Sequence, residues 1–330
     1  MVDPQVAQEI EETLLADRLK YTRAQVEELA GMPPEKARRI WQTLGFPAPD
    51  EDEVAFTESD VRALVEIERL VADGLVDSDG MLQLVRAVGQ TMGRLASWVV
   101  DVWLPSAAAA LPEDVELSPE TVSAVLGLTE ELRPRFEWLL LHGWRRQLAA
   151  AGLRVTAASG DASGDPAMGV ARLAVGFADI VSFTSLSRRM EGSALAEFVE
   201  RFEAVTAETV ADLGGRIVKT LGDEAFFVAP DPRAVAEIGI SLAERHNTDP
   251  NFPIVRVGLA YGEVVLRLGD VFGTPVNLAA RLTAAAHRGT ILIDSALAAE
   301  LPPTYETTPL RPRHLQGLGR TRPHRLRPHP

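Results

Sequence analysis

Two aspartates in the second half of the chain lie where short apolar segments end. Asp179 follows one apolar run, and Asp223 lies in a Gly-Asp turn between the segments 215–221 and 224–229. Carboxylate oxygens are the ligands that hard cations such as Mg²⁺ prefer, and the backbone carbonyl of Ile180 offers a further oxygen. The pattern predicts that both aspartates meet at one sheet edge and bind divalent cations there.

Other polar residues suit a phosphorylated ligand. Asn277 and Arg281 are four residues apart in a helix that Pro275 opens, so both project from one face. An arginine guanidinium matches the geometry of phosphate oxygens. The turn from Asp179 to Thr184, which includes Phe183, precedes another predicted helix, so its free N–H groups can bind phosphates. Together these residues indicate chemistry on a nucleoside triphosphate.

The elements expected to position these residues alternate between strands and helices from about residue 171. The predicted strands cover 172–178, 215–221, 224–229, 254–260, 263–268 and 290–294, and the predicted helices cover 184–190, 193–213, 232–246 and 275–287. Such alternation favours a layer of helices packed on a sheet.

The first half of the chain is predicted to be helical throughout. Thr22 with Gln25 forms a capping-box signature, and Thr57 caps a later helix. Further helices are expected at about 34–44, 80–103, 119–128 and 133–151. The small and polar residues 157–168 are expected to form a flexible connector.

The composition excludes several classes of protein. The 330 residues contain no cysteine, which excludes disulfides and thiolate metal sites. The net charge is −14 and most of the excess acid lies before residue 157, which makes nucleic-acid binding unlikely. The most apolar tract, 95–111, is interrupted by Asp101 and Pro105, and the first residues lack a signal-peptide pattern. We therefore predict no membrane span and a cytoplasmic location.

The order and spacing of these motifs resemble the catalytic domain of the class III nucleotidyl cyclases. The resemblance covers residues 171–320 and rests on Phe-Ala-Asp-Ile-Val-Ser-Phe-Thr at 177–184, Leu-Gly-Asp-Glu at 221–224 and Val-Asn-Leu-Ala-Ala-Arg at 276–281. It implies an α+β, ferredoxin-like domain that forms a homodimer and converts ATP into 3′,5′-cyclic AMP and pyrophosphate. It also implies two Mg²⁺ or Mn²⁺ ions in each active site, bound by Asp179, Ile180 and Asp223.

The resemblance assigns the remaining site residues as well. Lys219 and Asp270 correspond to the pair that recognises adenine, Asn277 to the residue that orients the ribose, and Arg281 to the one that stabilises the transferring phosphate. Each active site would combine the metal-binding residues of one subunit with these four residues of its partner. The family's late lysine for the triphosphate is missing, and Arg320 is the candidate replacement.

Residues 21–46 resemble the start of a MerR-type regulator, and the whole arrangement resembles actinobacterial cyclases with a helical autoinhibitory domain. This predicts an all-helical regulatory domain at 1–156, a flexible linker at 157–168 and a catalytic domain at 169–330. Two stimuli are considered for this regulatory domain. One is a proton, sensed through a histidine such as His142, and the other is a small apolar ligand that binds near 98–104.

Two alternative functions remain: a guanylyl cyclase, and a catalytically silent dimer that acts through its MerR-like module. A diguanylate cyclase is disfavoured because Leu221 and Ala225 replace two residues of the Gly-Gly-Asp-Glu-Phe turn.

Overall fold

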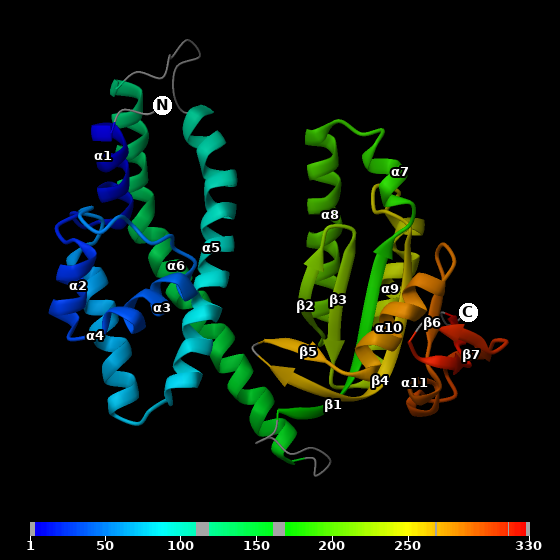
Figure 1. Cartoon of the computed structure of the whole chain (residues 1–330). Coiled ribbons are helices and arrows are strands. Elements are labelled where there is room, and N and C mark those ends of the chain that lie inside the picture. The colour runs from blue at the N-terminus through cyan, green and yellow to red at the C-terminus, as the bar shows by residue number, and fades with distance from the viewer. Residues whose placement is uncertain (1–3, 110–118, 161–168, 268, 316, 328–330) are drawn as a thin grey trace. The chain divides into compact units, whose positions relative to one another are not determined.

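A computed structural model describes residues 4–109, 119–160, 169–267, 269–315 and 317–327 (Figure 1). The chain divides into two compact units, Met1–Ala149 and Ala150–Pro330. None of the described helices is long and apolar enough to cross a membrane. The boundaries predicted from composition, 1–156 and 169–330, stay predictions.

Helices alone make up the described part of the first unit. They are α1 (Pro4–Leu15), α2 (Arg23–Ala30), α3 (Pro34–Leu44), α4 (Glu58–Ala72), α5 (Ser78–Ala109) and α6 (Pro119–Gly160). The sequence did not predict α1. The two helices predicted at 119–128 and 133–151 are the single helix α6, because Pro134 interrupts the backbone hydrogen bonds without ending the helix. The helix also includes four residues of the predicted connector, and 161–168 lie outside the described residues.

The predicted capping residues begin two of these helices. The Oγ1 atom of Thr57 accepts a hydrogen bond from the N–H of Asp60 at 3.2 Å, and the Asp60 carboxylate accepts one from the Thr57 N–H at 2.8 Å. The Thr22 N–H donates to Gln25 Oε1 at 2.9 Å. These caps orient the helices around one apolar core, which contains Val26, Met32, Ile40, Phe56, Leu64, Met81 and Val85.

The second unit is built on a mixed sheet. Its strands are β1 (Val170–Ile180), β2 (Arg216–Leu221), β3 (Glu224–Ala229), β4 (Val255–Arg267), β5 (Asp270–Phe272), β6 (Ile291–Ile293), β7 (Glu306–Pro309) and β10 (His324–Arg327). A separate hairpin contains β8 (Arg313–Leu315) and β9 (Gly319–Thr321). The helices are α7 (Phe183–Ser187), α8 (Gly192–Asp212), α9 (Pro232–Thr248), α10 (Thr274–Ala285) and α11 (Ser295–Glu300).

The central strands have the ferredoxin-like order β2-β3-β1-β4, with β6, β10 and β7 continuing the sheet. Strand β1 pairs antiparallel with both β3 and β4, and the chain order is β1-α8-β2-β3-α9-β4 apart from the short α7. The predicted α+β class, with an all-helical part before it, is confirmed.

Strand β4 is continuous, whereas the sequence predicted two strands, 254–260 and 263–268. Gly262 suggested a break, but it lies where α10 approaches the sheet. A Cβ atom at Gly262 would lie 3.0 Å from the Cγ atom of Pro275. The glycine therefore makes room for the helix and does not end the strand. The short strands β5 and β7 to β10 and helix α11 were not predicted.

The sheet has two differently covered faces. Helices α8 and α9 pack on one face, whose core includes Ala178, Phe202, Phe227, Ile238 and Leu259. Helix α10 packs on the other face, whose core includes Val175, Phe177, Phe226, Ala260 and Ala279 (Figure 1). Side chains along a strand alternate between the faces, so odd-numbered residues of β1 point toward α10.

Gly258 of β4 lets α10 lie directly against the sheet. A Cβ atom there would lie 2.3 Å from both the carbonyl oxygen of Ala279 and the backbone nitrogen of Thr283. The Thr283 hydroxyl is buried and donates to the Ala279 carbonyl at 2.9 Å. The helix backbone therefore has no freedom to move closer, and its position depends on this glycine.

We expect Gly258→Ala to lower the free energy of unfolding by about 1–3 kcal/mol, because overpacking forces α10 away from β4. Urea unfolding of the full chain, followed by circular dichroism, measures this change. Gly192→Ala is the matched control, since a Cβ atom at Gly192 would meet nothing within 4 Å. Equal unfolding midpoints for the two variants would contradict the close approach.

Candidate active site

Asp179 and Asp223 lie together at one end of the sheet. Asp179 of β1 pairs with Glu224 of β3 in the antiparallel register. The Ile180 N–H donates to the Asp223 carbonyl oxygen at 2.9 Å, which ties the end of β1 to the turn between β2 and β3. The structure therefore brings together the three residues that the sequence predicted as metal ligands.

Arg256 is a partner of Asp179 that sequence reasoning missed. It lies opposite Asp179 on β4, and its Nε and Nη2 atoms are 2.6 and 2.5 Å from the same carboxylate oxygen, Oδ2. Among the described residues no donor binds Oδ1 of Asp179, so that oxygen is available to a cation. The sequence did contain a signal, because Arg256 stands between the fully buried Val255 and Val257.

A third carboxylate adds negative charge to this edge. Burial raises the pKa of Asp179; the hydrogen bond and charge of Arg256 oppose that rise, and the nearby Asp223 adds to it. Burial also raises the pKa of Glu224, and the charges of Asp179 and Asp223 raise it further. The side chains of Asp179 and Glu224 are cross-strand neighbours on one face, where like charges repel. A bound cation would relieve this repulsion.

The donor set fits hard divalent cations. All the candidate ligands are oxygen atoms, which suits Mg²⁺ or Mn²⁺. Within the described parts of the chain, no three His, Asp or Glu side chains are already arranged around a metal position. Mg²⁺ commonly uses one or two carboxylates and takes its other ligands from substrate phosphates and water.

Lys219 and Asp270 bind each other. The Nζ atom of Lys219 donates to Asp270 Oδ2 at 2.7 Å, and the Val271 N–H donates to Oδ1 at 2.9 Å. Burial of Asp270 raises its pKa, but these hydrogen bonds outweigh that effect and the net pKa is lowered. Lys219 also lies 5.9 Å from the ring centre of Phe226, which stacks on Phe177. A cation and an anion are thus held side by side above two aromatic rings.

Asn277 and Arg281 lie on the outer surface of α10. Both are exposed, whereas Ala279, Leu282 and Thr283 of the same helix are buried. The backbone N–H of Asn277 donates to the Gly273 carbonyl at 3.3 Å, but the side chains of Asn277 and Arg281 make no hydrogen bond or ion pair with any residue that the structure describes. Their side chains are therefore free to contact a ligand or a second subunit.

Phe183 and Thr184 begin the short helix α7, which follows the end of β1 that carries Asp179 and Ile180. Ser182 before them has a left-handed conformation, with φ of 63°. The N–H groups of Ser185 and Leu186 donate to the Ser182 carbonyl at 3.0 and 3.1 Å. No backbone acceptor in the described chain takes the N–H groups of Phe183 and Thr184, so these can face a phosphate.

Arg320 lies on β9 and lines a pocket of about 250 Å³ beside α10. Leu278 and Leu282 of α10 line one side, and Arg320 and Arg322 line the other. Asp294 is also at this pocket, and burial raises its pKa to about 6 although backbone N–H groups oppose the rise. In α10, Leu278 follows Asn277 and Leu282 follows Arg281. Arg320 therefore lies beside the surface that Asn277 and Arg281 form.

In the first unit, the candidate sensing residues lie on exposed helix surfaces. The ring of His142 stacks on Trp138, with centroids 5.2 Å apart and an angle of 8°. Trp98 is 59% exposed and carries Arg94 over its ring at 5.4 Å. The 98–104 segment was weighed as a ligand pocket or ordinary core, but the exposure of Trp98 and Val102 shows that these two side chains are not core.

Comparison with known proteins identifies the family. Residues 167–327 match the family described as the adenylate and guanylate cyclase catalytic domain. An adenylate cyclase of Streptomyces coelicolor is 44% identical over 299 residues, which cover 91% of this chain and 76% of that protein. An adenylate cyclase of Glutamicibacter nicotianae is 40% identical over 305 residues, 88% of this chain and 73% of the relative.

A third relative carries a regulatory property in its name. The pH-sensitive adenylate cyclase of Mycobacterium tuberculosis is 27% identical over 312 residues, which cover 92% of this chain and 77% of that protein. The likeness to these relatives thus extends well beyond the catalytic half. It confirms the family that the sequence motifs predicted, and the chain belongs to the adenylate and guanylate cyclase family.

Proposed function

We propose that the chain is an adenylate cyclase, which converts ATP into 3′,5′-cyclic AMP and pyrophosphate in a homodimer. The observation that carries this proposal is that Asp179 and Lys219 lie on one face of the sheet and that Lys219 binds Asp270. The names of the two relatives at 40–44% identity support the same substrate. Cyclisation requires a 3′-oxygen nucleophile, neutralised phosphates and a stabilised pyrophosphate leaving group.

Asp179, Asp223 and the Ile180 carbonyl would hold two divalent cations. When bound, such ions neutralise phosphate charge and activate an oxygen nucleophile. Arg256 holds Oδ2 of Asp179 and leaves Oδ1 toward the ligand side. The N–H groups of Phe183 and Thr184, and the guanidinium of Arg320, would bind phosphate oxygens.

Lys219 and Asp270 would recognise adenine. Asp270 accepts a hydrogen bond from the adenine amino group, and Lys219 donates to a ring nitrogen. Guanine presents a carbonyl oxygen where adenine has its amino group, so it would face the acceptor Asp270 with another acceptor. A site with buried polar groups rejects the base that leaves them unpaired.

We expect Asp270→Asn to lower the preference for ATP over GTP by about tenfold, because the amide adds a donor for the guanine carbonyl. The measurement is kcat/KM for both nucleotides with Mn²⁺ and the full chain. Glu306→Gln, a carboxylate-to-amide change on β7, is the matched control. A wild-type protein that prefers GTP would contradict this assignment and support a guanylyl cyclase.

The second subunit would supply Lys219, Asp270, Asn277 and Arg281 to the metal-binding residues of the first. Asn277 would orient the ribose, and Arg281 would stabilise charge on the transferring phosphate. Two observations favour a second subunit that covers this surface. Asn277 and Arg281 point outward from α10, and large apolar residues lie beside the Lys219–Asp270 pair. Leu221 and Phe272 are 58% and 51% exposed in the single chain.

Asp223→Ala and Arg281→Ala should each reduce activity at least about a hundredfold, because each removes one essential half of both sites. Mixing them should restore about a quarter of wild-type activity, since half the dimers are mixed and each holds one complete site. Cyclic AMP formation by the refolded mixture measures this recovery. Sedimentation must show dimers for both variants, and no recovery in such dimers would contradict shared sites.

We further propose that the first unit restrains the catalytic unit and that a proton relieves this restraint. Two facts support the idea: the name of the Mycobacterium relative, and the stacking of His142 on Trp138. A protonated imidazole binds an indole ring more strongly than a neutral one does. Helix α6 carries this pair and continues past the boundary between the units at residue 149.

The activity of the full chain, divided by that of residues 150–330, should rise as pH falls from about 7.5 to 5.5, the range in which histidine usually titrates. His142→Gln should flatten this rise, because glutamine lacks the ring that stacks on Trp138. A ratio that is constant across the range would contradict acid activation. A ratio that rises equally in His142→Gln would assign the effect to another group.

A further inference from the structure

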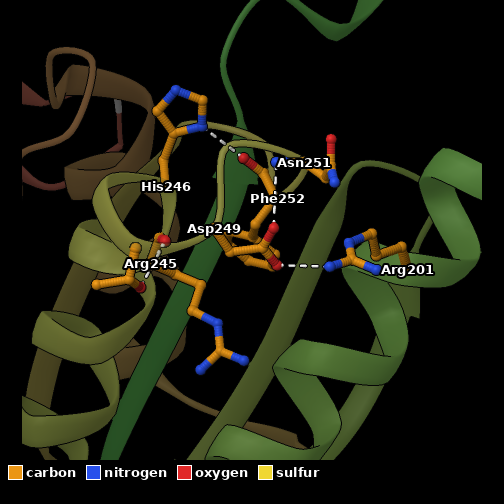
Figure 2. A network of polar contacts seen from close by, with 7 residues as sticks. Arg201, Arg245, His246, Asp249, Asn251 and Phe252 are labelled. Carbon is orange, nitrogen blue, oxygen red and sulfur yellow. Dashed lines mark hydrogen bonds and ion pairs between the residues drawn. The ribbon is translucent and has the colours of Figure 1, made fainter.

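A polar network fixes the loop between α9 and β4, as Figure 2 shows. Asp249 at the start of this loop accepts a hydrogen bond from Arg201 of α8, with Nη2 and Oδ2 2.7 Å apart. Its second oxygen, Oδ1, accepts from the Asn251 N–H at 3.1 Å. The hydrogen bond from Arg201 lowers the pKa of Asp249, so the carboxylate is ionised at neutral pH. Both of its oxygens are engaged.

Phe252 anchors the middle of the loop. Its N–H donates to the Asp249 carbonyl at 2.9 Å, and its own carbonyl lies 2.6 Å from Nδ1 of His246 (Figure 2). Its ring is fully buried and lies 5.9 Å from the ring of Phe202. The loop is therefore held to α8 through Arg201, to α9 through His246, and to the core through its own aromatic ring.

The residues that follow this loop contact the metal-binding edge directly. The carbonyl of Ile254 accepts a hydrogen bond from the Val181 N–H at 3.0 Å, just beyond the end of β1. Two residues later, Arg256 binds the carboxylate of Asp179. Hydrogen bonds and a short stretch of backbone thus connect Asp249 to the side chain of Asp179 and to the backbone of Val181.

We propose that Asp249, held by Arg201, is a positioning residue for the metal-binding edge. By fixing the loop it sets the start of β4, and thereby the guanidinium of Arg256 and the backbone of Val181. This inference rests on the proposed function, because it assumes that Asp179 binds cations. Asp249 itself contacts neither the cations nor the substrate.

Because the Arg201–Asp249 ion pair is partly exposed, its effect on the position of Arg256 can be distinguished from an effect on the stability of the fold. The side chains of Arg201 and Asp249 are 47% and 18% exposed. Exposed pairs usually contribute little to the free energy of unfolding. Losing the pair should therefore change the melting temperature slightly, while a misplaced Arg256 should weaken cation binding measurably. The two effects can be measured in the same sample.

The test measures Mn²⁺ binding to the full chain by electron paramagnetic resonance, with 3′-deoxy-ATP present. This nucleotide lacks the attacking hydroxyl, so no turnover disturbs the equilibrium. We expect Asp249→Ala to raise the Mn²⁺ dissociation constant about tenfold, the lower end of the range for losing a direct partner of a metal ligand, because Asp249 acts only through Arg256 and the backbone of Val181. Arg201→Lys keeps a cation within reach of Asp249, and it should retain most of the affinity.

Glu306→Ala is the matched control, because Glu306 pairs with Arg327 at 3.0 Å at the other edge of the sheet. It should leave the dissociation constant unchanged and lower the melting temperature as little as Asp249→Ala does. Asp249→Ala with wild-type affinity overturns the inference. So does a weakened affinity that comes with a much larger loss of melting temperature than in the control.

Asp223→Asn, measured in parallel, separates this inference from the proposed function. If Asp223→Asn weakens Mn²⁺ binding and Asp249→Ala does not, only the positioning role is wrong. If Asp223→Asn also binds Mn²⁺ like the wild type, the proposed metal site is wrong, and the role of Asp249 falls with it.

Discussion

The ion pair between Asp179 and Arg256 is the interaction on which the active-site edge depends. Asp179 is buried and has two carboxylates as neighbours, and both conditions favour its neutral form. Arg256 opposes them in part, so that the pKa of Asp179 is still raised, and it engages a single oxygen of the carboxylate. The aspartate is thereby fixed in orientation while one oxygen remains available. An uncompensated carboxylate here would tend to take up a proton and lose its value as a ligand.

The antiparallel register arranges the remaining groups in rows on the same face. Arg256, Asp179 and Glu224 lie opposite one another on β4, β1 and β3. Phe177 lies two residues before Asp179 on β1, and Phe226 lies two residues after Glu224 on β3. The two rings stack on each other beneath Lys219. The other face of the sheet is covered by α8 and α9, and the candidate site residues of the central strands lie on the α10 face. Because side chains alternate between the two faces along each strand, residues of the α8 and α9 core alternate with residues of the candidate site.

Much of this could be predicted from short-range patterns. Helix caps such as Thr57, the long apolar strand before Asp179 and the tight turn at Asp223 depend on neighbours in sequence, and they were identified from the sequence. Contacts across the sheet could not be derived in this way. Arg256 lies 77 residues from Asp179, and only the pairing of β1 with β4 brings them together.

Local signals also led to wrong predictions: some suggested breaks that are absent, and others were too weak to reveal short strands. Gly262 and Pro134 look like breaks, yet β4 and α6 continue through them, because tertiary contacts or the rest of the helix outweigh one unfavourable residue. The C-terminal strands are three or four residues long, too short for a periodic pattern. For the site, the resemblance to the cyclase family pointed to Lys219 and Asp270, but their hydrogen bond depends on the three-dimensional arrangement of β2 and β5.

That bond has a consequence for selectivity. Before any ligand binds, Lys219 and Asp270 are only partly exposed and each already has the other as its partner. Under the proposed function, an arriving purine would have to replace this mutual hydrogen bond with its own. A base with the wrong edge would separate the two charges without replacing the bond between them. Discrimination would then belong to the resting state of the protein as well as to its complex.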